Sequence, residues 1–316
     1  EFMDEIPFRN VYFTGIVRDK IGRKMSKTLG NSPDPLDLIA KYGADGVRMG
    51  ILLCTSAGND IMFDESQVEQ GRNFCNKIWN AYRLIKGWET AQTEQPVEAK
   101  IACDWFGSKL AMTESLVADH FAKFRINDAL MCIYKLFWDD FCAWYLELIK
   151  PAYGKPVDTV TFNTALGYFE QLLRLLHPFM PFITEELWHN IGERGEEETI
   201  MFQPTPEAGA FTQEIVADFD VATQVVVDLR ALRQKKNISP KEPLKLKVKG
   251  QYPVSMNPVV AKMANIDSIE VMDDFSSLGS GETFMVNTLQ FYVPLEGMID
   301  VETEKAKILA EIARYE

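Results

Sequence analysis

Residues 71–85 read Gly-Arg-Asn-Phe-Cys-Asn-Lys-Ile-Trp-Asn-Ala-Tyr-Arg-Leu-Ile. The apolar residues Phe74, Ile78, Ala81 and Ile85 recur here at i, i+4, i+7 and i+11, which is the spacing of one face of an α-helix. Most of the stability of such a helix comes from burying its apolar face against other elements. The stretch therefore predicts a helix that packs inside a larger helical assembly.

The helical pattern continues on both sides of this stretch, from about residue 66 to residue 236. Segments rich in proline, glycine or polar residues interrupt it, for example at 90–100 and 151–156. After the first helix, the expected helices begin at about 103 and cover about 127–150, 159–176, 181–191 and 214–236. Several long helices joined by such loops pack antiparallel as a bundle, so we expect a mainly α fold.

The segment before the bundle has a different character. Val11–Val17 is β-branched and aromatic and predicts a buried strand. A polar loop rich in glycine and lysine follows over 18–31. Asp34 is a candidate N-cap for a short helix at 36–42, and a second short helix is expected at 45–53.

The pattern changes again after Ser239-Pro240. Residues 244–249 read Leu-Lys-Leu-Lys-Val-Lys, an alternation typical of a strand with one buried face. Further strands are expected at 268–272, 283–286 and 289–294, with a short helix at 258–264. These elements predict a small α/β domain. Residues 301–316 are rich in Glu, Lys and Ala and predict the start of another helix.

The composition indicates which classes of protein this chain belongs to and which it does not. There is no run of about 20 apolar residues, so no membrane span is expected, and the first residues lack the basic and apolar regions of a signal peptide. The five cysteines have no Cys-x-x-Cys spacing and lie mostly among apolar neighbours, which favours a reduced, cytoplasmic protein. None of the three histidines pairs with a cysteine at zinc-ligand spacing, so no metal site is expected.

The net charge of −13, taken alone, argues against nucleic-acid binding. Net charge bears on solubility and steering, however, and one face of a protein can differ from it. The basic residues are unevenly distributed. One group lies at 18–27 and a second at 230–249, where Glu242 is the only acidic residue. Both groups are candidate sites for a polyanion.

The first basic group belongs to the sharpest motif of the chain, which reads Gly-Arg-Lys-Met-Ser-Lys-Thr-Leu-Gly-Asn over residues 22–31. Lysine carries a compact charge with three donors, and two lysines in a loop can stabilise the charge that develops on a departing pyrophosphate. A bare Lys-x-x-Lys also occurs in solvated basic loops. The flanking residues favour the first interpretation, because the segment resembles the KMSKS signature loop of class I aminoacyl-tRNA synthetases, with Thr28 replacing the last serine. The resemblance implies ATP contacts by Lys24, Met25, Ser26 and Lys27, with Lys24 and Lys27 as the catalytic residues.

The resemblance extends over nearly the whole chain. Residues 42–48 are similar to the helix pair that follows the signature loop in the Val/Ile/Leu group of these enzymes. Residues 58–61 and 71–81 are similar to the valyl-tRNA synthetases of bacterial type in particular. Residues 138–147 and 176–188 resemble segments shared by the bundle domains of the group. The chain therefore resembles a C-terminal fragment of a valyl-tRNA synthetase.

The resemblance implies five regions. These are the end of a Rossmann-type catalytic domain with the signature loop at 1–32, a stem-contact region at 33–65, an anticodon-binding helical bundle at 66–236, a small α/β domain at 237–298, and the start of a C-terminal coiled-coil helix at 299–316. The family's other ATP signature, His-x-Gly-His, is absent from the sequence. We therefore expect the fragment to bind tRNA but not to aminoacylate it by itself.

In the whole enzyme, the resemblance implies a valine–tRNA ligase that uses ATP, with Mg²⁺, and passes through an aminoacyl-adenylate. The implied partners are valine tRNA, ATP and valine, with no membrane and no obligate protein partner. An isoleucyl- or leucyl-tRNA synthetase is the alternative within the group. Outside it, a stand-alone helical RNA-binding module and a helical protein scaffold are the alternatives, although neither needs a nucleotide-binding loop.

Asn73, Asn76, Asn80 and Arg83 are expected on one face of the helix at 71–85, opposite its apolar residues. Amides and arginine can read the base edges of a single-stranded loop. The asparagines could also bond to neighbouring helices. The resemblance places the anticodon surface at the start of the bundle and adds these tRNA contacts: Met62, Ser66, Arg72 and Leu84.

The second basic group is expected to hold tRNA phosphates. Lys245, Lys247 and Lys249 alternate with apolar residues, so a strand would place all three on one side. Arg230 and Arg233 lie three residues apart and share a face of the preceding helix. If that helix docks beside the strand, one basic strip results. The alternative is that these lysines only keep an exposed strand soluble.

Overall fold

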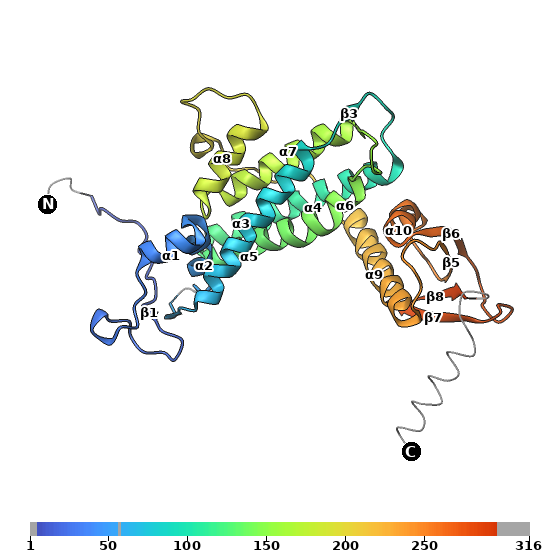
Figure 1. The fold of residues 1–316 in the computed structure, drawn as a ribbon, viewed down its shortest axis with the longest axis horizontal. Helices are drawn as coiled ribbons and strands as arrows, with labels where there is room; N and C mark the ends of the chain where they lie inside the picture. Colours follow the sequence, from blue (N-terminus) through green and yellow to red (C-terminus); the bar gives the residue numbers. More distant parts are fainter. Residues whose placement is uncertain (1–4, 56–57, 296–316) are drawn as a thin grey trace, which may run out of the picture. The chain divides into compact units, whose positions relative to one another are not determined.

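The computed structural model describes residues 5–55 and 58–295. These residues form two compact units (Figure 1). The first unit holds the residues up to Gln95 together with Phe106–Phe211, and the second holds Pro96–Trp105 together with the residues from Thr212 onward. Helices dominate the chain, which confirms the expected fold class. The helix expected at 301–316 lies outside the described residues.

The first unit is built mainly from helices. They are α1 (Pro35–Tyr42), α2 (Ala44–Leu53), α3 (Glu65–Lys86), most of α4 (Val97–Ala122), α5 (Ile126–Lys135), the π-helix η2 (Leu136–Tyr145), α6 (Leu146–Ile149), α7 (Thr159–Leu176), α8 (Pro181–Ile191) and the short 3₁₀ turns η1 (Lys27–Leu29) and η3 (Ile200–Phe202). Two short parallel strand pairs complete it: β1 (Val17–Arg18) with β2 (Ile61–Met62), and β3 (Thr90–Ala91) with β4 (Val157–Asp158). None of the helices among the described residues is both long and apolar enough to cross a membrane.

The apolar face predicted for α3 lies in the core of the first unit. Phe74, Ile78 and Ile85 are almost fully buried. The ring of Phe74 packs edge-on against that of Phe137 in η2, with 5.6 Å between the ring centres. Phe137 and Phe141 of η2 are both fully buried in this core, with 5.5 Å between their ring centres. Aromatic packing against η2 therefore holds α3 by one face and leaves its other face outside.

Glycines allow α2 and α3 to cross with their backbones in contact. A Cβ atom on Gly71 of α3 would lie 2.2 Å from the carbonyl oxygen of Gly46 on α2, and a Cβ atom on Gly50 would lie 2.6 Å from the Cα atom of Val68. Both distances are far below van der Waals contact, so any side chain here would force the helices apart. The two helices therefore form one close-packed pair.

Asp45 of α2 caps the start of α8, although the two are far apart in sequence. The residue before α8 provides no side-chain cap. The Asp45 carboxylate instead accepts a hydrogen bond from the backbone N–H of Ile183 at 2.6 Å and a longer one from that of Phe182 at 3.4 Å. Arg48, also on α2, donates to the two backbone carbonyls just before Met180. The two sequence motifs that contain these residues therefore meet in the fold.

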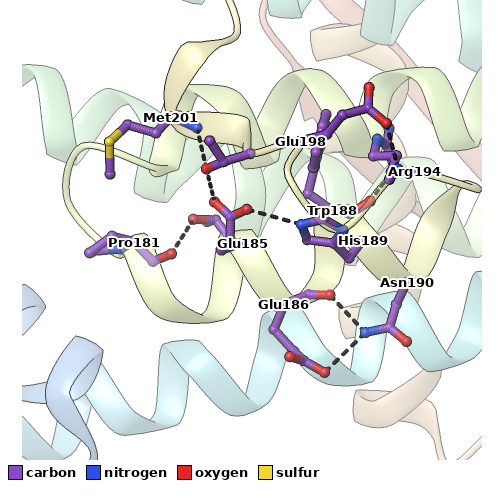
Figure 2. Close-up of polar contacts among 12 residues, drawn as sticks. Pro181, Glu185, Glu186, Trp188, His189, Asn190, Arg194, Glu198 and Met201 are labelled. Carbon is purple, nitrogen blue, oxygen red and sulfur yellow. Dashed lines mark hydrogen bonds and ion pairs between the residues drawn. The ribbon is translucent and has the colours of Figure 1, made fainter.

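Residues 193–198 read Glu-Arg-Gly-Glu-Glu-Glu and form an acidic loop after α8. Figure 2 shows how α8 holds this loop. The Glu185 carboxylate accepts a hydrogen bond from the Thr199 hydroxyl at 2.8 Å and lies 3.1 Å from Nε2 of His189. The guanidinium group of Arg194 stacks over the Trp188 ring, 3.8 Å from its centre. The acidic loop is thus attached to α8 at both of its ends.

The second unit combines α9 (Gln213–Lys236), the 3₁₀ turn η4 (Val254–Met256) and α10 (Asn257–Ala264) with a four-stranded sheet. The strands are β5 (Leu244–Lys249), β6 (Ile266–Val271), β7 (Gly281–Val286) and β8 (Leu289–Pro294), in the order β6-β5-β8-β7. Strands β5 and β6 are parallel, and the other two pairings are antiparallel. The elements expected for a small α/β domain are therefore present. Helix α9, expected as the last helix of the bundle, lies in the same compact unit as the sheet.

Two expectations near the N-terminal side of the chain were wrong. The segment 11–17 is not a buried strand: only its last residue enters β1, and Val11 and Phe13 are 68% and 78% exposed. A strand gains hydrogen bonds only from a neighbour, and the described part of the chain offers this segment only Ile61–Met62. Helix α4 begins at Val97 rather than near 103, because Pro96 is well tolerated at a helix start.

Candidate nucleic-acid interface

The lysine loop over residues 19–31 is organised by the Asp19 carboxylate. It accepts hydrogen bonds from the backbone N–H of Arg23 at 2.8 Å, from the Arg23 side chain at 2.7 Å and from the side-chain amide of Asn31 at 3.0 Å. The hydrogen bond from Asn31, followed by the bonds from Arg23, lowers the pKa of Asp19 to about 2. The two ends of the loop are therefore joined through one ionised side chain.

Asn31 also positions the middle of the loop. Its side-chain oxygen accepts from the backbone N–H of Ser26 at 2.9 Å, and its amide group donates to the carbonyl of Lys24 at 3.3 Å. The Ser26 hydroxyl caps the short turn η1. Neither Asp19 nor Asn31 was among the expected site residues, although short polar side chains in a Gly-rich loop are a recognised signal for such turns.

Lys24 and Lys27 are both exposed, while Met25 and Ser26 are half-buried. Within the described residues, no carboxylate lies within ion-pair distance of either ammonium group. Lys20, by contrast, pairs with Asp64 at 2.9 Å. The loop thus presents two uncommitted cations on a braced backbone, which is an arrangement suited to a polyphosphate.

The outer face of α3 carries the four polar residues expected there. Asn73, Asn76, Asn80 and Arg83 are all exposed. Of these four side chains, only that of Asn73 has a hydrogen bond within the described residues: it accepts a long one of 3.5 Å from Arg72. The alternative in which these asparagines bond to neighbouring helices therefore gains no support, and the groups remain available to a ligand.

The other expected tRNA contacts differ in exposure and in their partners. Ser66 is exposed, Met62 is 45% exposed, and Leu84 is half-buried. Arg72 is braced by the protein: it pairs with Glu69 at 3.1 Å, and its guanidinium group lies 5.5 Å from the centre of the Tyr42 ring.

The lysines of β5 alternate as expected with buried residues. Leu244, Leu246 and Val248 are fully buried, whereas Lys245 and Lys249 are exposed. Lys247 forms an ion pair with Glu270 on β6, and its hydrogen bond is the main cause of the lowered pKa of Glu270. The sheet face therefore offers two exposed lysines and one that is already neutralised.

Arg230 and Arg233 are used differently from the expected basic strip. Arg233 is 5% exposed and donates to the backbone carbonyls of Ser239, Ala264 and Asn265 at 2.8–3.1 Å. Arg230 is exposed and donates to the carbonyl of Met263 at 3.0 Å. The expectation that Arg233 contacts phosphate is therefore not supported, because burial and three carbonyls occupy its guanidinium group.

Comparison with known proteins adds to this geometry. Residues 1–64 match the family of class I tRNA synthetases for Ile, Leu, Met and Val, and residues 103–248 match the anticodon-binding domain of tRNA ligases. The chain is 55% identical over its whole length to a valine–tRNA ligase of Phocaeicola vulgatus, 49% identical to that of Porphyromonas gingivalis, and 37% identical over 99% of its length to that of Fusobacterium nucleatum. It spans 36–37% of the length of these relatives. The chain therefore belongs to the class I aminoacyl-tRNA synthetase family, and all of it is similar to a segment of the valine–tRNA ligases.

Proposed function

We propose that this chain is the tRNA-binding portion of an enzyme that joins valine to its tRNA with ATP, through an aminoacyl-adenylate. The observation that carries the proposal is the combination, in one chain, of a braced loop with two uncommitted lysines and a domain matching the anticodon-binding family. A helical scaffold or a stand-alone RNA-binding module needs no such loop. The names of the relatives favour valine over isoleucine and leucine.

In the whole enzyme, Lys24 and Lys27 bind the phosphates of ATP. The valine carboxylate attacks the α-phosphorus atom, and the bond to pyrophosphate breaks. The two ammonium groups stabilise the charge that moves onto the leaving pyrophosphate, and Met25 and Ser26 complete the contacts with ATP. Mg²⁺ accompanies ATP in this reaction, and we assign no residue of this chain to it.

The tRNA is held by two kinds of contact. Asn73, Asn76, Asn80 and Arg83 on α3 read unpaired bases of the anticodon loop, because amides and arginine offer directional donors and acceptors to base edges. Lys245 and Lys249 on β5 contact phosphates and add affinity without base preference. Both lysines are exposed, and so are all four residues of α3.

The five regions implied by the resemblance are part of this proposal. The end of the catalytic domain (1–32) and the stem-contact region (33–65) precede the anticodon-binding bundle (66–236), and the small α/β domain (237–298) precedes a coiled-coil helix (299–316). Such an enzyme serves translation, so we place the protein in the cytoplasm.

Filter binding of this chain to valine tRNA and to a second tRNA tests the proposal. We expect tighter binding of valine tRNA, and we expect Asn76→Ala and Arg83→Ala to reduce that preference. Arg125→Ala is the matched control, because Arg125 is an exposed arginine at the start of α5 that pairs with Asp128 at 2.6 Å. Equal affinity of the unmodified chain for both tRNAs would refute the proposed recognition.

A further inference from the structure

A cavity of about 550 Å³, lined by both apolar and polar residues, lies in the second unit, where α9 and α10 both end. Its rim includes the exposed residues Arg230, Gln234, Asn237 and Lys262, and its floor includes the buried residues Ile238 and Ala264. The volume falls within the range of about 300–1,000 Å³ that is typical of small-ligand sites. Its described lining includes no residue of the lysine loop or of the outer face of α3.

The ends of the two helices shape this cavity. Asn237 ends α9 and Asn265 ends α10, each in the left-handed region with φ of 54° and 53°. Carbonyl groups at a helix C-terminus carry partial negative charge, which disfavours an anion. Here the guanidinium groups of Arg233 and Arg230 donate to the last carbonyls of α10. Two arginines thus offset the negative end of the helix from within the cavity wall.

The side chains around the cavity suit a nucleotide. No carboxylate is among the described residues that line it. Lys262 forms an ion pair with Glu98 at 3.4 Å, and its side chain stays 32% exposed, so a phosphate can approach the ammonium group from the solvent side. The amides of Gln234 and Asn237 each offer a donor and an acceptor, the pattern that base edges require. The apolar floor suits the face of a planar ring.

We propose that this cavity binds one unstacked nucleotide of the tRNA, with its phosphate on Lys262 and Arg230 and its base against Gln234 and Asn237. The proposal rests on the proposed function, because single-stranded loops of a folded RNA supply such nucleotides. An isolated phosphate would use only the cations and would leave the amides and the apolar floor without a role. The same chemistry is found in a free nucleoside monophosphate.

Methyl NMR of methionine gives a direct test, because Met263 also lines the cavity. The chain is labelled with ¹³C at its methionine methyl groups, and Met263→Leu assigns the signal. Uridine 5′-monophosphate, the other three ribonucleoside monophosphates, uridine and inorganic phosphate are then titrated separately. We expect at least one nucleotide to shift the Met263 signal at concentrations about tenfold lower than uridine or phosphate requires, since phosphate and base contacts add. Equal effects of phosphate and nucleotides, or no shift with any probe, would overturn the proposal.

Variants locate the contacts. Lys262→Gln and Asn237→Ala should each weaken nucleotide binding about tenfold, and unchanged shifts of the other methionine signals show that the fold is kept. Lys241→Gln is the matched control, because Lys241 is exposed and does not line the cavity. If Lys241→Gln weakens binding as much as Lys262→Gln does, the effect is general electrostatics and the site is not the one proposed.

A titration with valine tRNA shows whether the cavity binds a nucleotide of the tRNA or only a free nucleotide. It also separates a failure of the cavity proposal from a failure of the proposed function. Met62 of β2, which is 45% exposed and is one of the expected tRNA contacts, serves as a second reporter. Shifts of both Met62 and Met263 support the nucleotide cavity in tRNA binding. A shift of Met62 alone overturns the cavity proposal and leaves the proposed function intact, whether or not free nucleotides bind. If tRNA shifts neither signal, the proposed function itself fails.

Discussion

The two basic groups of this chain look alike in sequence and differ in the folded protein. In the lysine loop, Lys24 and Lys27 are exposed, and no described carboxylate pairs with them. In the later group, Arg233 is buried among backbone carbonyls and Lys247 is paired with Glu270. The number of positive residues in a segment therefore does not give the number of cationic side chains that a polyanion can contact. Availability depends on which acceptors the fold brings close to each charge.

The largest expected effect concerns Lys24 and Lys27, the two lysines of the loop that pair with no described carboxylate. In the whole enzyme, Lys27→Ala should slow valine-dependent ATP–pyrophosphate exchange about 10²–10³-fold, since it removes charge stabilisation from the transition state. Lys20→Ala is the matched control, because Lys20 lies in the same loop but pairs with Asp64. The chain alone should show no exchange. Equal effects of the two substitutions would show that pairing with Asp64 does not make Lys20 less important for the reaction than Lys27.

The buried arginine should matter for stability instead. Arg233→Ala should lower the free energy of unfolding by about 3 kcal/mol, because it leaves three carbonyl groups without their donor. Lys24→Ala and Lys27→Ala should change it by less than about 0.5 kcal/mol. Urea denaturation monitored by circular dichroism measures both. A stable Arg233→Ala protein would show that the guanidinium group is not essential to this part of the fold.

Glu114 of α4 is a buried carboxyl group that the fold compensates only in part. It is 5% exposed, and its Oε1 atom has no hydrogen-bond partner among the described residues. Burial raises the pKa of Glu114 from 4.5 to about 7, and the charge of Arg174 opposes this only in part. The folded state therefore holds a proton that the unfolded state releases between these pH values, so this contribution to stability is complete below pH 4.5 and is lost as the pH rises through 7.

Glu114→Gln tests this reasoning. The variant keeps the shape of the side chain without its charge. The change that it causes in the free energy of unfolding should therefore be about 1–3 kcal/mol more favourable at pH 8 than at pH 5. Urea unfolding at both pH values gives the difference. Asp119→Asn on the same helix is the control, because Asp119 is exposed and paired with Lys123. The same difference in both variants would contradict a special role for burial.

The smallest expected effect separates the lysines of β5. Removal of one lysine that binds a phosphate should flatten the slope of log affinity against log salt by about one unit. Lys245→Ala and Lys249→Ala together should therefore reduce the slope for tRNA binding by up to about two units, whereas Lys247→Ala should change it little because Glu270 already neutralises that charge. Filter binding at several salt concentrations measures the slopes. A large effect of Lys247→Ala would show that the ion pair opens when RNA binds.

Local sequence patterns were enough to predict most of the helices and their buried faces. The spacing of Phe74, Ile78 and Ile85 predicted the buried side of α3, and the alternation in 244–249 predicted a strand with lysines on one side. These predictions held because a period of 3.6 or 2 residues is a local property of the backbone, and burial follows from it. The lysine loop could also be found from sequence, since its residues are contiguous.

Which polar groups find hydrogen-bond partners depends on contacts between distant parts of the chain. Asp45 caps a helix more than 130 residues away, Arg233 covers the end of α10, and the cavity beside Asn237 exists only because two helices end side by side. The segment 11–17 has strand composition but lacks a partner along most of its length within the described chain. A hydrogen bond or a strand pairing needs a second group, and local sequence does not specify which distant group arrives there.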